Sequence, residues 1–160
     1  MSVTVRPARA EDVGAIAGLL RAFGRYWGHE DWVTGSEAAL ADALFGPAPR
    51  GFGHIACVDD AAVGVALWFI TYNFWMARPI LYLEDLFVDE AARGSGAGAA
   101  LMRALAAEAL ARDCTWMNWA VLNDDARANR FYAGLGAVTH PDSTLWRLET
   151  EALTALAAQG

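Results

Sequence analysis

Apolar positions recur with two different periods along the chain, and together they predict a mixed fold of helices and strands. The opening VTVRP alternates between apolar and polar residues, as a half-buried strand does. The next apolar residues recur at helical spacing, and they are Val13, Ile16, Leu19, Leu20 and Phe23. Acidic residues just before them suit the N-terminus of a helix, and a second helix is expected near residues 37–44, beyond a polar bend.

The rest of the chain continues this pattern without repeats or linkers. Strands are predicted over residues 54–60 and 61–73, joined at the turn-forming pair Asp59-Asp60, and over 80–88, 115–122 and 143–149. Helices are predicted from about Gly96 to Arg112, from Asp124 or Asp125 to Gly134 or Gly136, and over 150–158. This order of elements predicts one α/β (α+β) domain, residues 1–160, built on a single mixed sheet.

Composition excludes several classes of protein. With 160 residues, 56% of them hydrophobic and 19% charged, the chain can bury a substantial core. A formal net charge of -7 argues against nucleic-acid binding and favours cationic or neutral partners. All basic residues are arginine, which rules out both a lysine Schiff base and a phosphate-loop lysine.

The cysteines, the histidines and the hydropathy of the chain bear on metal binding, membrane contact and cellular location. Cys57 and Cys114 stand alone in apolar surroundings, as buried thiols of a reducing cytoplasm do. His29, His54 and His140 are scattered, so no metal site is expected. The uncharged stretch 61–77 is shorter than the ~20 residues of a spanning helix, and its β-branched and aromatic content indicates a buried strand. The N-terminus lacks the apolar region of a signal peptide, so a cytoplasmic protein without membrane contact is expected.

The sequence VDEAARGSGAGAALMRAL places glycines at 94, 96 and 98 between a predicted strand and a predicted helix. One interpretation is a dinucleotide fingerprint, but residues 114–123 lack the carboxylate expected ~20 positions on. Another is a plain flexible turn. The third is an anion site, because backbone N–H groups at a helix N-terminus are unsatisfied and glycines let a ligand approach them.

The stretch from Arg93 to Gly98 fits the pattern R/Q-x-x-G-x-G/A and resembles the pyrophosphate-binding signature of the GNAT acyltransferases. The resemblance extends through YLEDLFVDEAARGSGAG, NWAVLNDDARANRFYAGLGA and LWRLE to nearly the whole chain, and residues 80–136 are its most specific part. Within that superfamily the chain is similar to the spermidine/spermine and thialysine N-acetyltransferase branch. The resemblance implies a mostly antiparallel mixed sheet, splayed between its fourth and fifth strands, with helices on both faces, and a homodimer.

The resemblance also implies which residues hold the co-substrate, acetyl-CoA. Main-chain groups of Leu86, Phe87 and Val88 would hold the acetyl and pantetheine groups, and an N–H near Phe87 or Val88 would stabilise the oxyanion. The pyrophosphate would lie on Arg93, Gly94, Ser95, Gly96, Ala97, Gly98 and Ala99, with Asp125 and Ala128 completing the cofactor-binding set. Tyr132 matches the tyrosine that protonates the departing thiolate, although a core aromatic would fit its position too.

A small-molecule amine is the second substrate that the resemblance implies. Glu84 would accept the proton of the amine, which is mostly ammonium at pH 7 because its pKa is ~10. The remaining amine-site residues would be Tyr26, Glu30, Asp31, Asn73, Trp75, Asp85 and Trp119. Two plainer interpretations stay open: Glu84 and Asp85 as partnered structural acids, and Glu30 and Asp31 as a solvated loop. Because neighbours on a strand point to opposite faces, only one of Glu84 and Asp85 should face the site unless a bulge intervenes.

One departure from the family pattern bears on the cofactor. Asp124-Asp125 stands where the family has Trp-Asn, so the amide donor to the cofactor is missing, although aspartate can still cap a helix. The sequence therefore predicts acetyl transfer by direct attack in a ternary complex, without a covalent acyl-enzyme. Two alternatives are kept: acetylation of another amine, such as an antibiotic or a protein N-terminus, and a coenzyme A-binding sensor that has lost turnover.

Overall fold

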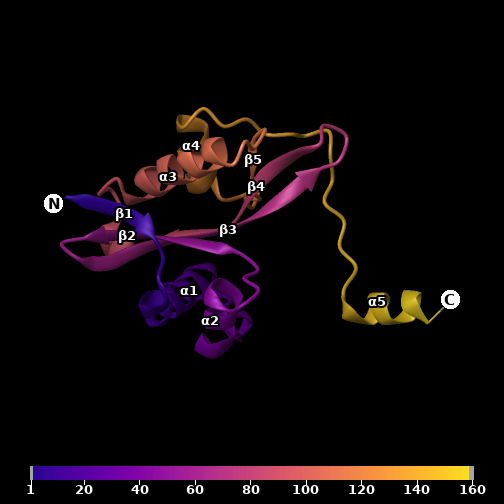
Figure 1. Ribbon diagram of the computed structural model, residues 1–160, viewed down its shortest axis with the longest axis horizontal. Coiled ribbons are helices and arrows are strands. Elements are labelled where there is room, and N and C mark those ends of the chain that lie inside the picture. The colour runs from indigo at the N-terminus through magenta and orange to yellow at the C-terminus, as the bar shows by residue number, and fades with distance from the viewer. Residues whose placement is uncertain (1, 159–160) are drawn as a thin grey trace. The chain divides into compact units, whose positions relative to one another are not determined.

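The computed structural model describes residues 2–158, which divide between Ala120 and Val121 into two compact units (Figure 1). The first unit holds a five-stranded sheet in the order β1-β2-β3-β4-β5. Its strands are β1 (Val3–Pro7), β2 (Phe52–Val58), β3 (Ala61–Asn73), β4 (Arg78–Val88) and β5 (Met117–Asn118). The first four pair antiparallel, and β5 pairs parallel with β4. The predicted mixed, mostly antiparallel sheet is confirmed.

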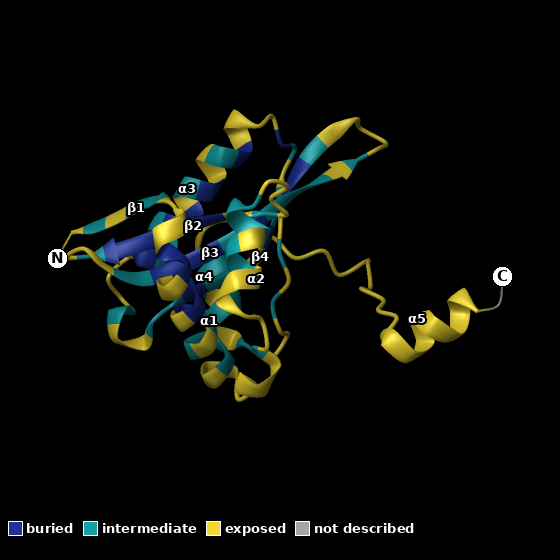
Figure 2. Ribbon diagram, turned by 60° about the horizontal axis from the view of Figure 1, so that its bottom comes forward, coloured by how far each residue is buried: buried dark blue, intermediate teal, exposed yellow. Residues whose placement is uncertain are grey.

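Helices α1 (Val13–Trp27) and α2 (Glu37–Phe45) belong to one face of this sheet. Ile16 and Leu19, on the apolar face of α1, pack in a core cluster that also contains Ile55, Val65 and Phe87 from the strands. Phe23 of α1 stacks on Phe87 with ring centroids 5.2 Å apart, so the helix rests on the C-terminal half of β4. Figure 2 shows the buried positions gathered on these inner strands and helices.

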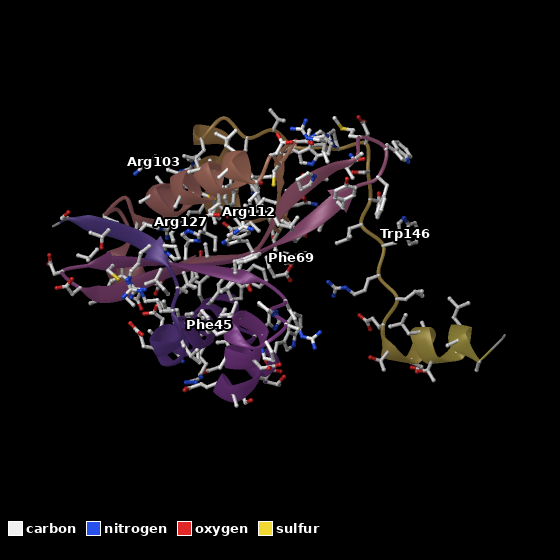
Figure 3. All side chains as sticks on the ribbon, viewed as in Figure 1. Phe45, Phe69, Arg103, Arg112, Arg127 and Trp146 are labelled. Carbon is white, nitrogen blue, oxygen red and sulfur yellow. The ribbon has the colours of Figure 1, made fainter. Side chains whose placement is uncertain are left out.

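Helix α3 (Ala97–Ala111) covers the opposite face. The indole N–H of Trp68 donates to Nδ1 of the buried His54 at 3.1 Å, and Nε2 of His54 lies 3.9 Å from the Glu108 carboxylate of α3. The guanidinium of Arg112, labelled in Figure 3, lies over the rings of Phe52 and Trp68. Helices therefore flank the sheet on both sides, as predicted.

Two turns hold the ends of the early strands. Asp59 and Asp60 both adopt positive φ, at 48° and 65°, and join β2 to β3 as the hairpin predicted from these residues. At the start of α1, Asp12 accepts two hydrogen bonds from Arg6, at 2.6 and 2.7 Å, and one from the Arg9 amide. Asp12 is the last residue of the short 3₁₀ turn η1 (Ala10–Asp12) and directly precedes α1, so these hydrogen bonds fix the start of the helix. The Arg6 guanidinium, in hydrogen bonds to Asp12, lowers the pKa of that carboxyl.

The strand predicted over residues 115–122 is wrong in extent, because β5 includes only Met117 and Asn118. These residues pair with Leu81 and Tyr82, and β4 then continues to Val88 with no strand on that side among the described residues. A strand exists only where a neighbour can accept its hydrogen bonds, and here the neighbours diverge. The loss of pairing is the splay between the fourth and fifth strands that the resemblance implied.

The second unit contains α4 (Ala126–Gly134) and α5 (Thr150–Ala157), both close to their predicted bounds. The predicted strand 143–149 is wrong: these residues form no ladder, although their apolar and polar positions alternate. Leu145 and Trp146 are 81% and 89% exposed, so no sheet covers them among residues 2–158. Trp146 projects from this stretch as a free side chain in Figure 3.

Candidate active site

The turn that opens α3 carries the predicted pyrophosphate site. Gly94 and Gly96 have φ of 82° and 91°, in the left-handed region where residues with a side chain are strained. Glycine adopts this backbone conformation without strain. A Cβ added at either position would meet nothing within 4 Å. Ala97 donates its N–H to the Ser95 hydroxyl at 3.3 Å. The backbone N–H groups of Gly94, Gly96, Gly98 and Ala99 have no partner in the described chain.

These unpaired N–H groups sit at the positive end of a fifteen-residue helix. Anions bind at such helix ends because the amides and the dipole act together. The arrangement fits a phosphate or diphosphate group, as the glycine pattern predicted.

Arg93 is held by two neighbours beside this turn. Its guanidinium pairs with the carboxylate of Glu90, in the 3₁₀ turn η3 (Glu90–Ala92), and lies 4.4 Å from the ring centroid of Tyr26 on α1. The Arg93 side chain is only 18% exposed. These contacts fix the Arg93 side chain against the loop.

The strand before the turn has one open edge. Among the described residues, β4 pairs beyond Tyr82 only with β3, up to Gly64 opposite Val88. On the side away from β3, the main-chain groups of Leu86, Phe87 and Val88 have no strand neighbour within residues 2–158. Gly64 allows β3 to approach β4 closely, because a Cβ at this position would lie 3.1 Å from the Phe87 carbonyl oxygen. The edge can therefore pair with an extended ligand, as a further strand would.

A β-bulge turns both carboxylates of β4 to the same face. Leu67 opposes Asp85 and the next residue, Trp68, opposes Leu83, so Glu84 is an extra residue. Leu83 shares the α3 face with Trp68, and its neighbour Glu84 therefore points to the α1 face. Asp85 shares the α1 face too, because its partner Leu67 packs on the core cluster there. The bulge that the sequence left open is present.

The two carboxylates differ in their surroundings. Glu84 is exposed, whereas Asp85 is half-buried, and neither has an ion pair or hydrogen bond within residues 2–158. Burial, with the charge of Glu84 as a second cause, raises the pKa of Asp85 to about 6. An interpretation as partnered structural acids is therefore not favoured.

Tyr132 and the predicted cap lie together in the second unit. Asp125 caps α4, since its Oδ1 accepts from the N–H of Ala128 at 2.8 Å. Burial, aided by the charge of Asp125, raises the pKa of Tyr132 to about 12, so the phenol stays protonated at neutral pH. The ring of Tyr132 meets Phe131 edge-on at 5.0 Å.

The predicted amine-site residues do not form one cluster within the first unit. Tyr26 lies under Arg93, and Glu30 pairs with Arg25 at 2.9 Å beside the exposed Asp31. Asn73 and Trp75 occupy the tip of the β3–β4 hairpin, where Asn73 Oδ1 accepts from the Trp75 amide. Asn73 pairs with Arg78, six residues and about 20 Å of strand from Glu84. Trp119 follows β5 and is half-buried.

Some site residues were not foreseen from the sequence. Glu90 fixes Arg93 three residues away, a spacing that pairs charges in helical turns and could have indicated it. Asn129 donates from its side-chain amide to the carbonyls of Leu122 and Asp125, and so shapes the turn before α4. The sequence indicated this role of Asn129 only weakly, because asparagine inside a helix has no single preferred role.

Residues 2–158 contain no group of three or more histidine, cysteine, aspartate and glutamate side chains placed to hold a metal ion. In the same part of the chain, every helix is too short or too polar to cross a bilayer.

Similarity to known proteins identifies the family of this chain. Residues 10–137 match the acetyltransferase (GNAT) family. A thialysine N-epsilon-acetyltransferase of Bos taurus is 33% identical, over 98% of this chain and 98% of its own length. A human spermidine/spermine N(1)-acetyltransferase-like protein 1 is 29% identical over 90% of this chain and 22% of its own. A solved integron cassette protein of V. cholerae matches with a TM-score of 0.83, at 27% identity over 98% of both chains.

The match to the family covers most of the chain, and the similar proteins align over nearly its full length. Members of this family take the acetyl group from acetyl-CoA. The chain belongs to the GNAT acetyltransferase family.

Proposed function

We propose that this chain moves the acetyl group of acetyl-CoA to the primary amine of a small molecule by direct attack in a ternary complex. The observation that carries this is the set of backbone N–H groups at the start of α3, those of Gly94, Gly96, Gly98 and Ala99, that have no partner among the described residues. Such unpaired N–H groups suit the diphosphate of coenzyme A. A chain with a net charge of -7 would attract anions weakly elsewhere, so a single concentrated anion site is consistent with this cofactor.

The pantetheine arm and the thioester would lie along the open edge of β4. Their amides and carbonyls would pair with main-chain groups of Leu86, Phe87 and Val88, which have no strand neighbour on that side in the described part of the chain. A backbone N–H at Phe87 or Val88 would hold the negative oxygen that develops during attack. Phe23, stacked on Phe87, supports this strand from the α1 face.

The acid pair of β4 and Tyr132 account for the proton transfers. A carboxylate of the pair takes one proton from the ammonium, and the neutral amine then forms the new C–N bond. When the C–S bond breaks, the sulfur takes a proton from Tyr132, and the nitrogen releases its second proton, which restores the phenol. The balance is one ammonium and one thioester giving one amide, one thiol and one proton.

The proposed acceptor is a diamine, a polyamine or an amino acid with a side-chain amine, such as thialysine. The names of the similar proteins support this class, and so do the net charge of -7 and the unpaired carboxylates. A second cationic group of such a substrate would be attracted to exposed acids such as Glu30 and Asp31.

A panel of amines, with free thiol as the readout, tests this function. We expect thiol release with thialysine, ornithine, spermidine or a short diamine, and little with a peptide N-terminus or an aminoglycoside. Turnover only on peptides or only on antibiotics would replace the small-amine proposal. Tight acetyl-CoA binding by calorimetry with no thiol release from any amine would instead indicate a sensor.

We further propose that the chain works as a homodimer in the cytoplasm. The homodimer has support from the apolar side chains that each unit exposes, Phe74 and Trp75 at 85% and 100% in the first and Leu145 and Trp146 in the second. Exposed aromatic residues of this kind are typical of surfaces covered by a partner.

A further inference from the structure

We infer that Tyr26 is a positioning residue of the cofactor site: the face of its ring holds the guanidinium of Arg93, and through Arg93 it fixes the turn that opens α3. This inference rests on the proposed function, because it concerns the proposed diphosphate site at that turn. The family resemblance places Tyr26 among the amine-site residues. Its contact with Arg93 gives the same side chain a second role, toward the cofactor.

The chain between β4 and α3 is anchored to the sheet at its first residues. The N–H of Asp89 donates to the Val63 carbonyl of β3 at 2.8 Å, and the Asp89 carboxylate accepts from the Ala91 amide at 3.0 Å. Neither bond reaches Gly94 or Gly96, whose positive φ marks the part of the backbone with the greatest conformational freedom. The N–H groups of these glycines need a further constraint if they are to keep one arrangement.

Arg93, which lies between η3 and the glycines, supplies this constraint. Its guanidinium pairs with the Glu90 carboxylate through Nη1 and lies 4.4 Å from the centroid of the Tyr26 ring. A guanidinium at this distance over an aromatic face makes a cation–π contact, which is stronger when the cation is shielded from water. The Arg93 side chain is largely buried, so the contact is well shielded.

The contact with Tyr26 differs in kind from the pair with Glu90. Glu90 lies three residues from Arg93 on the same stretch, so their ion pair moves with the turn and does not hold it against another element. In the described part of the chain, no hydrogen bond or ion pair joins residues 89–96 to α1. The contact between Arg93 and Tyr26 is therefore the polar link between the turn and that helix.

The end of α1 holds the Tyr26 ring in place. Gly28 closes the helix in the left-handed conformation, with φ of 73°, and its N–H donates to the carbonyls of Arg25 and Gly24. The chain then folds back on the helix, because the N–H of His29 donates to the Gly24 carbonyl at 2.9 Å. Tyr26, in this last turn, thus stands on a closed helix end and gives Arg93 a fixed support.

The same helix end carries the acids proposed to attract a cationic substrate. The 3₁₀ turn η2 (Glu30–Trp32) packs so closely on α1 that a Cβ at Gly24 would lie 3.2 Å from the Cα of Glu30. Tyr26 therefore belongs to one packed unit with Glu30 and Asp31. The proposed amine site and the proposed cofactor site meet at Tyr26.

The ring and the hydroxyl of Tyr26 can serve these two sites separately. Arg93 lies over the ring, and a cation–π contact needs no hydroxyl. The hydroxyl makes no hydrogen bond within residues 2–158, and Tyr26 is 41% exposed, so the hydroxyl is available to a substrate. Phenylalanine keeps the ring without the hydroxyl, whereas leucine removes both. These two substitutions therefore separate positioning of the cofactor turn from contact with the amine.

Positioning of the turn should raise the affinity for acetyl-CoA. A turn that is already ordered loses less conformational entropy when the diphosphate binds, so more of the interaction free energy appears as affinity. Loss of the Tyr26 ring should leave the N–H groups of Gly94 and Gly96 present but less ordered. The result is weaker acetyl-CoA binding without the loss of any group that contacts the diphosphate.

Calorimetry with acetyl-CoA on the full chain, without any amine, tests this role. We expect Tyr26→Leu to weaken binding by about 5- to 20-fold, the range of a shielded cation–π contact, and Tyr26→Phe to bind as the wild type does. Leucine is a good helix former, so the Tm of Tyr26→Leu should stay close to that of the wild type. Trp32→Leu is the matched control, because Trp32 is an exposed aromatic of η2 that stacks on His29 with centroids 4.1 Å apart. It should leave acetyl-CoA affinity unchanged.

A double-mutant cycle tests whether Tyr26 acts through Arg93. Arg93→Met removes the guanidinium and should weaken acetyl-CoA binding by itself. In that background Tyr26→Leu should weaken binding further by less than about 2-fold, because the contact is already lost. Equal losses in the two backgrounds would mean that Tyr26 acts independently of Arg93, and would overturn the inference.

A thioester without the diphosphate separates the turn from the rest of the site. S-acetylpantetheine carries the thioester and the pantetheine arm but not the diphosphate. With the best amine of the panel, its kcat/KM should be the same in Tyr26→Leu and in the wild type, whereas kcat/KM for acetyl-CoA should fall in Tyr26→Leu. An equal fall for both thioesters would indicate a general defect of α1 and would overturn the inference.

Different results would overturn the proposed function and this inference. A wild type that binds no acetyl-CoA would end the proposed function, and the positioning role of Tyr26 with it. A wild type that binds acetyl-CoA, with Tyr26→Leu binding as tightly, would defeat only the inference. Tyr26→Phe binding as weakly as Tyr26→Leu would also defeat it, since the hydroxyl and not the ring would then be responsible.

Discussion

At the scale of single residues, Tyr132 makes the most direct prediction about chemistry. Its pKa, raised to about 12 by burial and then by the charge of Asp125, keeps the phenol protonated across the working range. Tyr132→Phe should therefore lower kcat by about 100-fold, the scale of a lost general acid, with little change in acetyl-CoA affinity. Stopped-time thiol assays and calorimetry measure the two quantities.

A matched control for that variant is Tyr72→Phe, which removes a hydroxyl from the exposed hairpin arm and should leave kcat unchanged. The raised pKa also predicts that no basic limb from Tyr132 enters the profile below about pH 10. Equal rates for Tyr132→Phe and the wild type would remove Tyr132 from the mechanism.

His54 predicts how stability depends on pH. Burial lowers its pKa, with Arg112 adding to and Glu108 opposing that shift, and its Nδ1 must be unprotonated to accept from Trp68. The unfolded chain binds a proton at about pH 6.5, so stability from neutral His54 is complete above that pH and is lost as the pH falls below it. Tm should therefore drop between about pH 7.5 and 5.5.

His54→Gln supplies the comparison for this prediction. Glutamine can still accept from the Trp68 indole but does not titrate, so its Tm should change less over the same range. Asp85 acts in the opposite direction, because its raised pKa favours the folded state as pH falls, but this contribution is common to both proteins. If Tm fell equally with pH in the wild type and in His54→Gln, the protonation of His54 would not be the cause of the fall.

The acid pair shows where prediction by residue stops. Both carboxylates and their possible role could be read from YLEDLFV, and so could the condition on a bulge. The bulge itself could not, because it is a property of the register between β3 and β4. Which acid is buried depends in turn on that register, since a single extra residue exchanges the faces of all later side chains.

At the scale of elements, the turn into α3 makes a prediction about glycine. Gly96→Ala places a Cβ at φ of 91°, which should lower the free energy of unfolding by about 1–2 kcal/mol, although the space is open. Acetyl-CoA affinity should fall further than stability, because the methyl group would stand where the diphosphate meets the backbone. Thermal melts and calorimetry measure the two effects separately.

Gly18→Ala is the matched control for this element. Gly18 lies inside α1, exposed, with nothing within 4 Å of an added Cβ and with ordinary helical φ. The same substitution there should raise stability by about 1 kcal/mol, because alanine is the better helix former, and leave acetyl-CoA binding unchanged. A similar effect on binding at both positions would count against a site at the turn.

Elements with a strong local signal were predictable, and those that need a distant neighbour were not. Helix α1 follows from its own apolar spacing, and α4 from the capping Asp125, which lies just before its first residue. The stretches 115–122 and 143–149 have the alternation of strands, yet a strand is completed only by pairing. The first pairs for two residues before β4 and β5 separate, and the second has no ladder.

At the scale of the whole molecule, the proposed homodimer gives the last prediction. The stretch 143–149 exposes Leu145 and Trp146 at 81% and 89%, and an unpaired strand pattern with large apolar side chains is favourable only when a partner covers it. We expect the wild type to sediment with twice the mass of the chain at micromolar concentration. Replacing Leu145 and Trp146 together by serine should shift it to the monomer.

Leu110 allows this result to be separated from a general loss of apolar surface. It is 79% exposed on α3 and stands apart from the other exposed apolar residues in sequence, so Leu110→Ser should remain a dimer. Acetyl-CoA binding at the α3 turn should survive in both variants, because the turn belongs to the first unit and 143–149 to the second. A wild type that sediments as a monomer at all concentrations would contradict the dimer, and acetyl transfer by single chains would then have to proceed with Trp146 in water.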